Sequence, residues 1–294
     1  MWPTLLIIIY CVLIMAASLL GGWLPSVVRF THTRMQITMS FVAGLMMGVA
    51  LLHMLPHAAV EAGSLDHVAY AAVLGLLAMF FVIRIFHVHG HEPPDSPVEE
   101  HGHECQHPPG RCHEHPHVHE LSWLGLFGGL AMHTLIDGVA LAASVAAQTD
   151  GDAMGLIGLG TFVAVVLHKP LDALSITSIM LAGGWSPQAR RIINIAFSLM
   201  CPIGAVVFYF AVGTLGEAAK PAVGWSLGFA AGAFLCISLA DVLPEVQFHR
   251  HDRLKLSMAL ILGVALAWAI GLFEPSHEHS SKPPAAQHSD HQDH

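Results

Sequence analysis

The stretch that decides the fold is "HKPLDALSITSI", residues 168–179, which lies inside a long apolar run. Ionisable residues at membrane depth are costly and usually face a cavity or a partner. Apolar windows of about 20 residues, each able to cross about 30 Å of hydrocarbon, recur on both sides of it. The chain is 54% hydrophobic and only 11% charged, whereas soluble domains carry about 25% charged residues. The sequence therefore predicts an all-α polytopic membrane protein.

Eight apolar segments are predicted to span the membrane. They cover residues 3–25, 38–58, 66–87, 121–147, 153–183, 189–215, 221–246 and 252–273. We interpret the first as a retained helix, because it lacks a basic n-region and is too long for the apolar core of a signal peptide. The organisation expected is helices 1–3 in residues 1–87, a loop at 88–120, helices 4–8 in 121–273 and a tail at 274–294.

Basic residues set the expected orientation in the membrane. The loops after spans 1, 3, 5 and 7 hold Arg29, Arg34, Arg84, Arg111, Arg190, Arg191, Arg250, Arg253 and Lys255. The opposite side holds only Lys220 and Lys282. Because cytoplasmic loops carry the excess of Lys and Arg, both termini are predicted on the non-cytoplasmic side of a plasma (inner) membrane.

Two polar tracts are rich in histidine and are predicted to be disordered. Residues 87–119 hold ten of the 23 histidines, and the tail holds five. Such tracts are typical of metal binding, although a solvated linker, or a tag-like artefact for the tail, is the alternative. The candidates for metal capture in the cytoplasmic loop are His101, His103, Cys105, His107, Cys112, His113, His115, His117 and His119. Cys105 and Cys112 could instead pair with each other.

Internal repeats predict the architecture. "FVAGLMMGVALLHMLPHA" at 41–58 resembles "GFAAGAFLCISLADVLPEV" at 228–246, and "HTLIDGVALAAS" at 133–144 resembles "HKPLDALSITSI" at 168–179. Pairing span 2 with span 7 and span 4 with span 5 implies pairing 1 with 6 and 3 with 8. The prediction is a 3+2+3 inverted repeat, a common build of alternating-access transporters whose site lies at the midplane.

The two central spans each carry a histidine and an aspartate four residues apart, His133 with Asp137 and His168 with Asp172. This spacing puts both side chains on one helix face. Two imidazoles and two carboxylates suit a divalent first-row cation. The alternative is that each pair only holds helices together by polar contacts.

These motifs resemble the signature helices of the ZIP family of zinc and iron permeases. The likeness covers spans 2 to 7, and the His-rich loop lies where that family has its variable loop. It implies eight helices in a 3+2+3 arrangement that carry Zn²⁺, Fe²⁺ or Mn²⁺ toward the cytoplasm between helices 4 and 5. His133, Asp137, His168 and Asp172 match the family's ligand motifs.

The sequence departs from the family pattern at Thr134 and Lys169, where asparagine and an acid are usual. The resemblance assigns those positions to a second metal, so a second metal is not expected here. A branch of the family with His-Lys in helix 5 is the most similar. We expect Lys169 to pair with Asp137 or Asp172 and to supply a fixed positive charge, with snorkelling of its amine to water as the alternative.

Polar residues beside two prolines are candidates for the ion pathway. His53 and Asp241 each precede a proline by three residues, and His57 and Glu245 follow those prolines. Proline frees helical carbonyls, although polar residues near a helix end need no function. Met46, Met47 and Met54 are interpreted as ordinary lipid or core contacts.

The sequence favours a transporter over an enzyme or a nucleic-acid-binding protein. The expected substrate is Zn²⁺, with Fe²⁺, Mn²⁺ or Cd²⁺ also compatible, and no cofactor is expected. An intramembrane zinc metalloenzyme and a metal sensor or buffer are the alternatives. The expected partners are metal ions and the lipid bilayer, with a homodimer as one open possibility.

Overall fold

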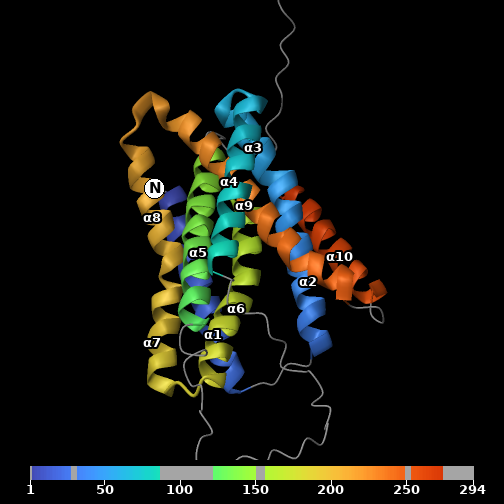
Figure 1. The fold of residues 1–294 in the computed structure, drawn as a ribbon. Coiled ribbons are helices and arrows are strands. Elements are labelled where there is room, and N and C mark those ends of the chain that lie inside the picture. The colour runs from blue at the N-terminus through green and yellow to red at the C-terminus, as the bar shows by residue number, and fades with distance from the viewer. Residues whose placement is uncertain (1, 28–31, 87–121, 150–155, 249–252, 274–294) are drawn as a thin grey trace, which may run out of the picture.

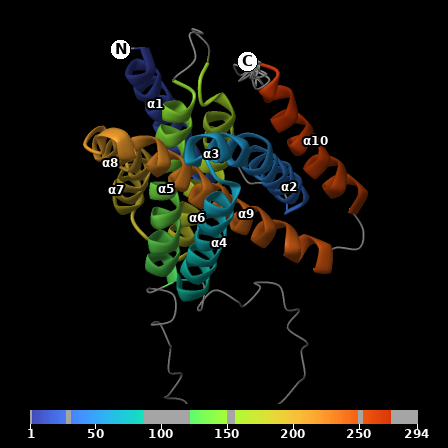
Figure 2. The same ribbon diagram turned by 90° about the horizontal axis from the view of Figure 1, so that it is seen from above.

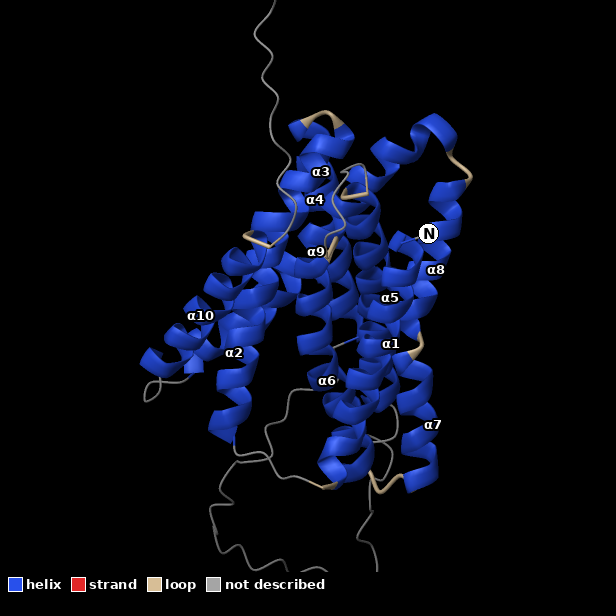
Figure 3. Cartoon of the chain, turned by 180° about the vertical axis from the view of Figure 1, so that it is seen from behind, coloured by secondary structure: helices blue, strands red, loops and turns tan. Residues whose placement is uncertain are grey.

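The computed structural model describes residues 2–27, 32–86, 122–149, 156–248 and 253–273, and within these ranges it contains helices and turns but no strand (Figure 3). The elements are α1 (Trp2–Trp23), η1 (Leu24–Ser26), α2 (His32–Val49), η2 (Ala50–Met54), α3 (Leu55–Ala62), α4 (Leu65–Phe86), α5 (Ser122–Ala147), α6 (Leu159–Ala182), α7 (Pro187–Ser198), α8 (Met200–Gly213), η3 (Gly216–Ala218), α9 (Ala219–Phe248) and α10 (Arg253–Gly271). Eight helical segments in the described residues are long and apolar enough to cross a membrane. The predicted all-helical, eight-span protein is confirmed.

Two of the spans are interrupted where prolines remove backbone donors. The second span passes through the π-helical turn η2 before Pro56, which cannot donate to the carbonyl of Leu52. The sixth span divides into α7 and α8 at Leu199, because Pro202 cannot donate to the carbonyl of Ser198. π-Helical turns are uncommon and often occur at functional positions.

The helices pack in four main pairs: α2 with α10, α4 with α9, α5 with α8, and α1 with α6. α10 lies at one edge of the molecule and α7–α8 at the opposite edge, with α5 and α6 between them (Figures 1 and 2). α5 also packs against α6 and α9. The two central helices are therefore enclosed by the others.

Glycines allow the backbones of the paired helices to approach closely. A Cβ at Gly44 of α2 would collide with the carbonyl oxygen of Leu260 in α10, and one at Gly263 of α10 with that of Phe41. The same reciprocal contact occurs between α4 and α9. A Cβ at Gly75 would collide with the carbonyl oxygen of Phe229, and one at Gly232 with that of Ala72. Small residues at helix contacts are the usual means of close packing in membranes.

Substituting Gly232 with alanine is expected to destabilise the protein by about 1–3 kcal/mol, the usual penalty for overpacking. The new methyl group would meet the backbone of Ala72, which cannot move without shifting α4. The measurement is thermal unfolding of the detergent-solubilised variant. Gly213→Ala is the matched control, because no atom lies within 4 Å of a Cβ at that position. An unchanged melting temperature for Gly232→Ala would contradict the tight α4–α9 contact.

Candidate metal site

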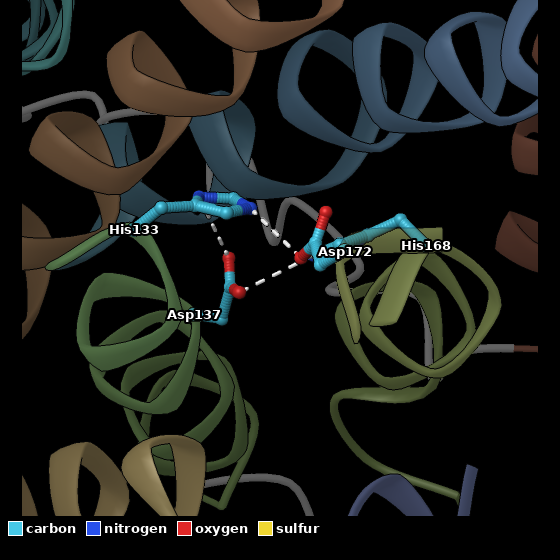
Figure 4. Close-up of side chains that lie close together, drawn as sticks. All are labelled: His133, Asp137, His168 and Asp172. Carbon is cyan, nitrogen blue, oxygen red and sulfur yellow. Dashed lines mark hydrogen bonds and ion pairs between the residues drawn. The ribbon is translucent and has the colours of Figure 1, made fainter. Parts of the chain in front are cut away.

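Four side chains from the two central helices point toward one another, His133 and Asp137 from α5 and His168 and Asp172 from α6 (Figure 4). One ligand atom from each lies within 4.8 Å of those of the other three. His133, Asp137 and His168 are at most 3% exposed, whereas the side chain of Asp172 is 16% exposed. The structure thus brings together the four residues that the sequence pairs in two separate helices.

The cluster leaves several buried polar atoms without a protein partner. His133 Nδ1 lies 3.6 Å from Asp137 Oδ1, and His133 Nε2 lies 3.7 Å from Asp172 Oδ2, both too long for hydrogen bonds. Among the described residues, neither ring nitrogen of His133 has a hydrogen-bond partner, and neither does Asp137 Oδ1. Buried polar atoms normally have a hydrogen-bond partner or bind an ion. These atoms therefore point to a partner that comes from outside the protein.

His168 is oriented by its own helix. Its Nδ1 lies 2.9 Å from the carbonyl oxygen of Ala164, which can only accept, so Nδ1 donates. In the neutral ring Nε2 then carries a lone pair, and it lies 3.2 Å from Asp137 Oδ2. Two acceptors at this distance repel each other unless a proton or a cation lies between them.

Lys169 is buried beside the cluster and points its amine into it. Nζ donates to Asp137 Oδ2 at 2.5 Å, to Thr134 Oγ1 at 2.9 Å and to Asp172 Oδ2 at 3.1 Å. Thr134 donates its own proton to the carbonyl of Leu130, which leaves its oxygen free to accept. With Lys169 only 1% exposed, the amine does not reach the surface, and the snorkelling interpretation is excluded.

The ring of Phe197 in α7 lies beside the same amine, with its centroid 5.6 Å from Nζ. An aromatic face at this distance attracts a cation. Phe197 could not be predicted from the sequence, because no spacing rule relates α7 to α6. The lysine is therefore held by three oxygens and one ring.

A cavity of about 450 Å³ adjoins the cluster on one side, and His133, His168 and Asp172 form part of its wall. The rest of the wall comes from residues 35–46 of α2, the N-terminal half of α5 and the C-terminal halves of α4, α6 and α9. These parts of the helices lie toward the side of the molecule on which α4 ends and α5 begins. The cluster is thus reached from the half of the molecule in which α4 ends and α5 begins.

Comparison with known proteins identifies the family. The sequence profile described as "ZIP Zinc transporter" matches residues 82–271, well over half of the chain. The chain belongs to the ZIP family. This ZIP protein is 32% identical over 166 residues to zinc transporter ZIP9 of Macaca fascicularis, an alignment covering 51% of the chain and 67% of that protein.

Zinc transporter ZIP10 proteins are also similar to this ZIP protein. The one from Danio rerio is 26% identical over 167 residues, and the one from Homo sapiens is 25% identical over 209 residues. The alignments cover 53% and 63% of this chain but only 18% and 24% of those proteins. The ZIP protein therefore spans a minor part of the length of its ZIP10 relatives.

His53 and His57, the two predicted pathway residues whose side chains the structure describes, do not join the cluster. His53 is buried in η2 and its Nε2 lies 2.7 Å from the carbonyl oxygen of Ala267 in α10. His57 lies against Gln148, with their Nε2 atoms 3.2 Å apart. The side chains of Asp241 and Glu245, the loop residues His101 to His119 and the tail lie outside the described residues. Their roles stay predictions.

Proposed function

We propose that this chain carries zinc, or a related divalent cation such as Fe²⁺ or Mn²⁺, toward the cytoplasm through a site formed by His133, Asp137, His168 and Asp172. The membership in the ZIP family supports the substrate class. The buried cluster supports the location of the site.

The observation that carries the proposal is the spacing of the four side chains. The four distances between a histidine nitrogen and an aspartate oxygen are 3.2, 3.6, 3.7 and 3.8 Å. Two ligand atoms that each lie about 2.1 Å from a tetrahedral Zn²⁺ are about 3.4 Å apart. His133 offers a different ring nitrogen to each carboxylate, so one of its two contacts is lost when a single ion binds. Only small side-chain movements are needed.

A cation would also satisfy the atoms that the protein leaves without partners. It would accept a lone pair from His133, replace the repulsion between His168 Nε2 and Asp137 Oδ2 by attraction, and bind Asp137 Oδ1. The bond from His168 Nδ1 to the carbonyl of Ala164 holds the lone pair of Nε2 toward the ion. Such outer hydrogen bonds commonly orient metal-binding histidines.

Lys169 supports a site for one ion rather than two. Its amine binds the same Oδ2 atoms of Asp137 and Asp172 that face the histidines. Those oxygens therefore cannot also bridge to a second cation at the position of the amine. In our proposal Lys169 holds the carboxylates together when no ion is bound and weakens their hold on the ion when it is bound, which favours release.

The position of the cavity supports a route to the cytoplasm. The cavity lies toward the side on which α4 ends and α5 begins, and the distribution of Lys and Arg predicts that the segment joining these two helices is cytoplasmic. We therefore propose that the described conformation faces inward, with both termini outside the cytoplasm. The specific membrane and a homodimeric assembly remain predictions of the sequence.

The helix pairs support the predicted inverted repeat. Exchanging span 1 with 6, 2 with 7, 3 with 8 and 4 with 5 converts the α2–α10 contact into the α9–α4 contact, and the α1–α6 contact into the α8–α5 contact. All four of these contacts are extensive. We infer a 3+2+3 arrangement about an axis through the central pair, which places the cluster between two halves as in other alternating-access proteins.

Metal flux into sealed vesicles tests the proposal. The purified protein is reconstituted into liposomes that contain a fluorescent chelator, and Zn²⁺, Fe²⁺, Mn²⁺ and Cd²⁺ are added outside in turn. Zinc-dependent signal above that of protein-free liposomes is expected. Hydrolysis of a lipid or peptide without flux would favour a metalloenzyme, and binding without either would favour a sensor or buffer.

Deleting residues 90–118 is expected to leave the rate of zinc flux within about twofold of the parent protein, since polar tracts of this composition form no packed core. The four cluster residues and the cavity wall lie outside the deleted segment. Flux in liposomes, corrected for the amount of reconstituted protein, gives the comparison. Loss of flux by a correctly inserted deletion variant would show that the loop belongs to the transport mechanism.

A further inference from the structure

A set of methionines lines the cavity beside the cluster. Met35, Met39 and Met46 come from α2 and Met79 from α4, and they share the wall with His133, His168 and Asp172. We propose that these four thioethers, here called the methionine wall, are a second and weaker set of ligands that contacts thiophilic cations between the cluster and the cytoplasmic side. The inference rests on the proposed transport function and adds a determinant of which metals are carried.

The geometry of α2 places three of the four thioethers on one face. At about 100° per residue, Met39 and Met46 lie within about 40° of Met35 around the helix. Val42, which lies between them on the same face, also lines the cavity. A cation that leaves His133 or Asp172 for the cavity therefore enters a space bordered by three methionine side chains of α2.

The four members of the methionine wall border the cavity, although two of them also belong to the core. Met35 and Met39 are half-buried, whereas Met46 and Met79 are 1% and 3% exposed and pack in the core on their other side. Met180, in contrast, lies fully inside the core beside Phe197 and does not line the cavity. The four wall residues border an open volume of about 450 Å³.

The chemistry of a thioether suits a transient ligand. The sulfur is neutral, soft and polarisable, so it binds thiophilic cations such as Cd²⁺ and Ag⁺ and interacts little with Mn²⁺, which prefers oxygen. Asp172 is the one carboxylate that lines the cavity among the described residues. Weak neutral ligands offer a soft ion a partial replacement for lost water without trapping it. The methionine wall should therefore favour soft cations over hard ones.

The test measures zinc flux into the same chelator-containing liposomes, with the whole 294-residue chain and with Cd²⁺, Ag⁺ or Mn²⁺ added as a competing metal. In the fourfold variant Met35→Leu, Met39→Leu, Met46→Leu and Met79→Leu, leucine keeps the volume and removes the sulfur. The concentration of Cd²⁺ or Ag⁺ that halves zinc flux is expected to rise about tenfold, while that of Mn²⁺ changes by less than about twofold. Met258→Leu is the matched control, since Met258 is 58% exposed on α10 and is not part of the cavity wall.

Equal inhibition of the variant and the parent by Cd²⁺ and Ag⁺ would overturn the methionine wall, and so would an equal change for all three metals, which would show a purely structural effect. If the fourfold variant does not fold, Met35→Leu with Met39→Leu at the two half-buried positions is expected to give about a threefold rise for Cd²⁺. Absence of any metal flux by the parent protein would instead overturn the proposed function.

Discussion

Zinc flux is expected to fall by about two orders of magnitude when Asp137 or Asp172 is replaced by alanine, because the site then lacks one of its two carboxylates and loss of even an outer partner of a metal ligand costs about 10–100-fold in affinity. Each carboxylate supplies a negative charge that the two histidines cannot replace. The fold should survive, since Lys169 keeps a hydrogen bond to Thr134 and to the remaining aspartate. Initial flux and the amount of correctly folded protein are measured on the same liposome preparations.

The matched control for these two variants is Asp66→Ala. Asp66 lies in the first turn of α4 and is exposed, so its carboxylate contributes to no buried site. Flux of this control should equal that of the parent protein. Parent-like flux in both Asp137→Ala and Asp172→Ala would refute the assignment of the site.

Replacing Lys169 with glutamate is expected to raise the number of transported ions bound per chain from about one to about two, since a carboxylate would stand where the ammonium now binds Asp137 and Asp172. A protein without residues 90–118 and without the tail is used, so that the histidine-rich tracts do not contribute. Metal content after equilibrium dialysis gives the stoichiometry, and zinc should raise the melting temperature of the glutamate variant more than that of the parent.

Lys169→Met separates the two effects of this substitution. Methionine removes the positive charge and adds no carboxylate, so the stoichiometry should stay at one while the ion binds more tightly. Two ions bound to the unsubstituted core would show that the lysine does not take the place of a second metal.

Each half of the central cluster could be predicted from the sequence because it depends on local geometry, and the repeat between spans 4 and 5 suggested that the two halves belong together. A spacing of four residues puts His133 over Asp137 and His168 over Asp172 whatever the rest of the fold does. The position of Lys169 could be predicted in the same way. It directly follows His168, and the next residue along a helix points about 100° away, so its side chain lies beside the His168–Asp172 pair. Its contact with both carboxylates is confirmed.

Features that depend on how distant helices meet could not be predicted. The methionine wall needs the packing of α2 against α6 and of α4 against α5. Phe197 comes from α7, and no pattern in the sequence links it to the cluster. The start of the fifth span was also misplaced, because the apolar run continues before the helix begins. α6 begins at Leu159, after Gly158 adopts a positive φ of 70°, a conformation that favours glycine.

The ammonium of Lys169 also has an electrical consequence. With neutral histidines, Asp137, Asp172 and Lys169 together carry one negative charge, and one bound divalent cation changes this to one positive charge. A membrane potential that is negative inside drives a positive site inward and a negative site outward, with about 2.3 kcal/mol for each charge that crosses 100 mV. Without the lysine the loaded site would be neutral and would gain nothing from the voltage. In the proposed transport cycle, a buried lysine would thus let the potential assist both the loaded and the returning half.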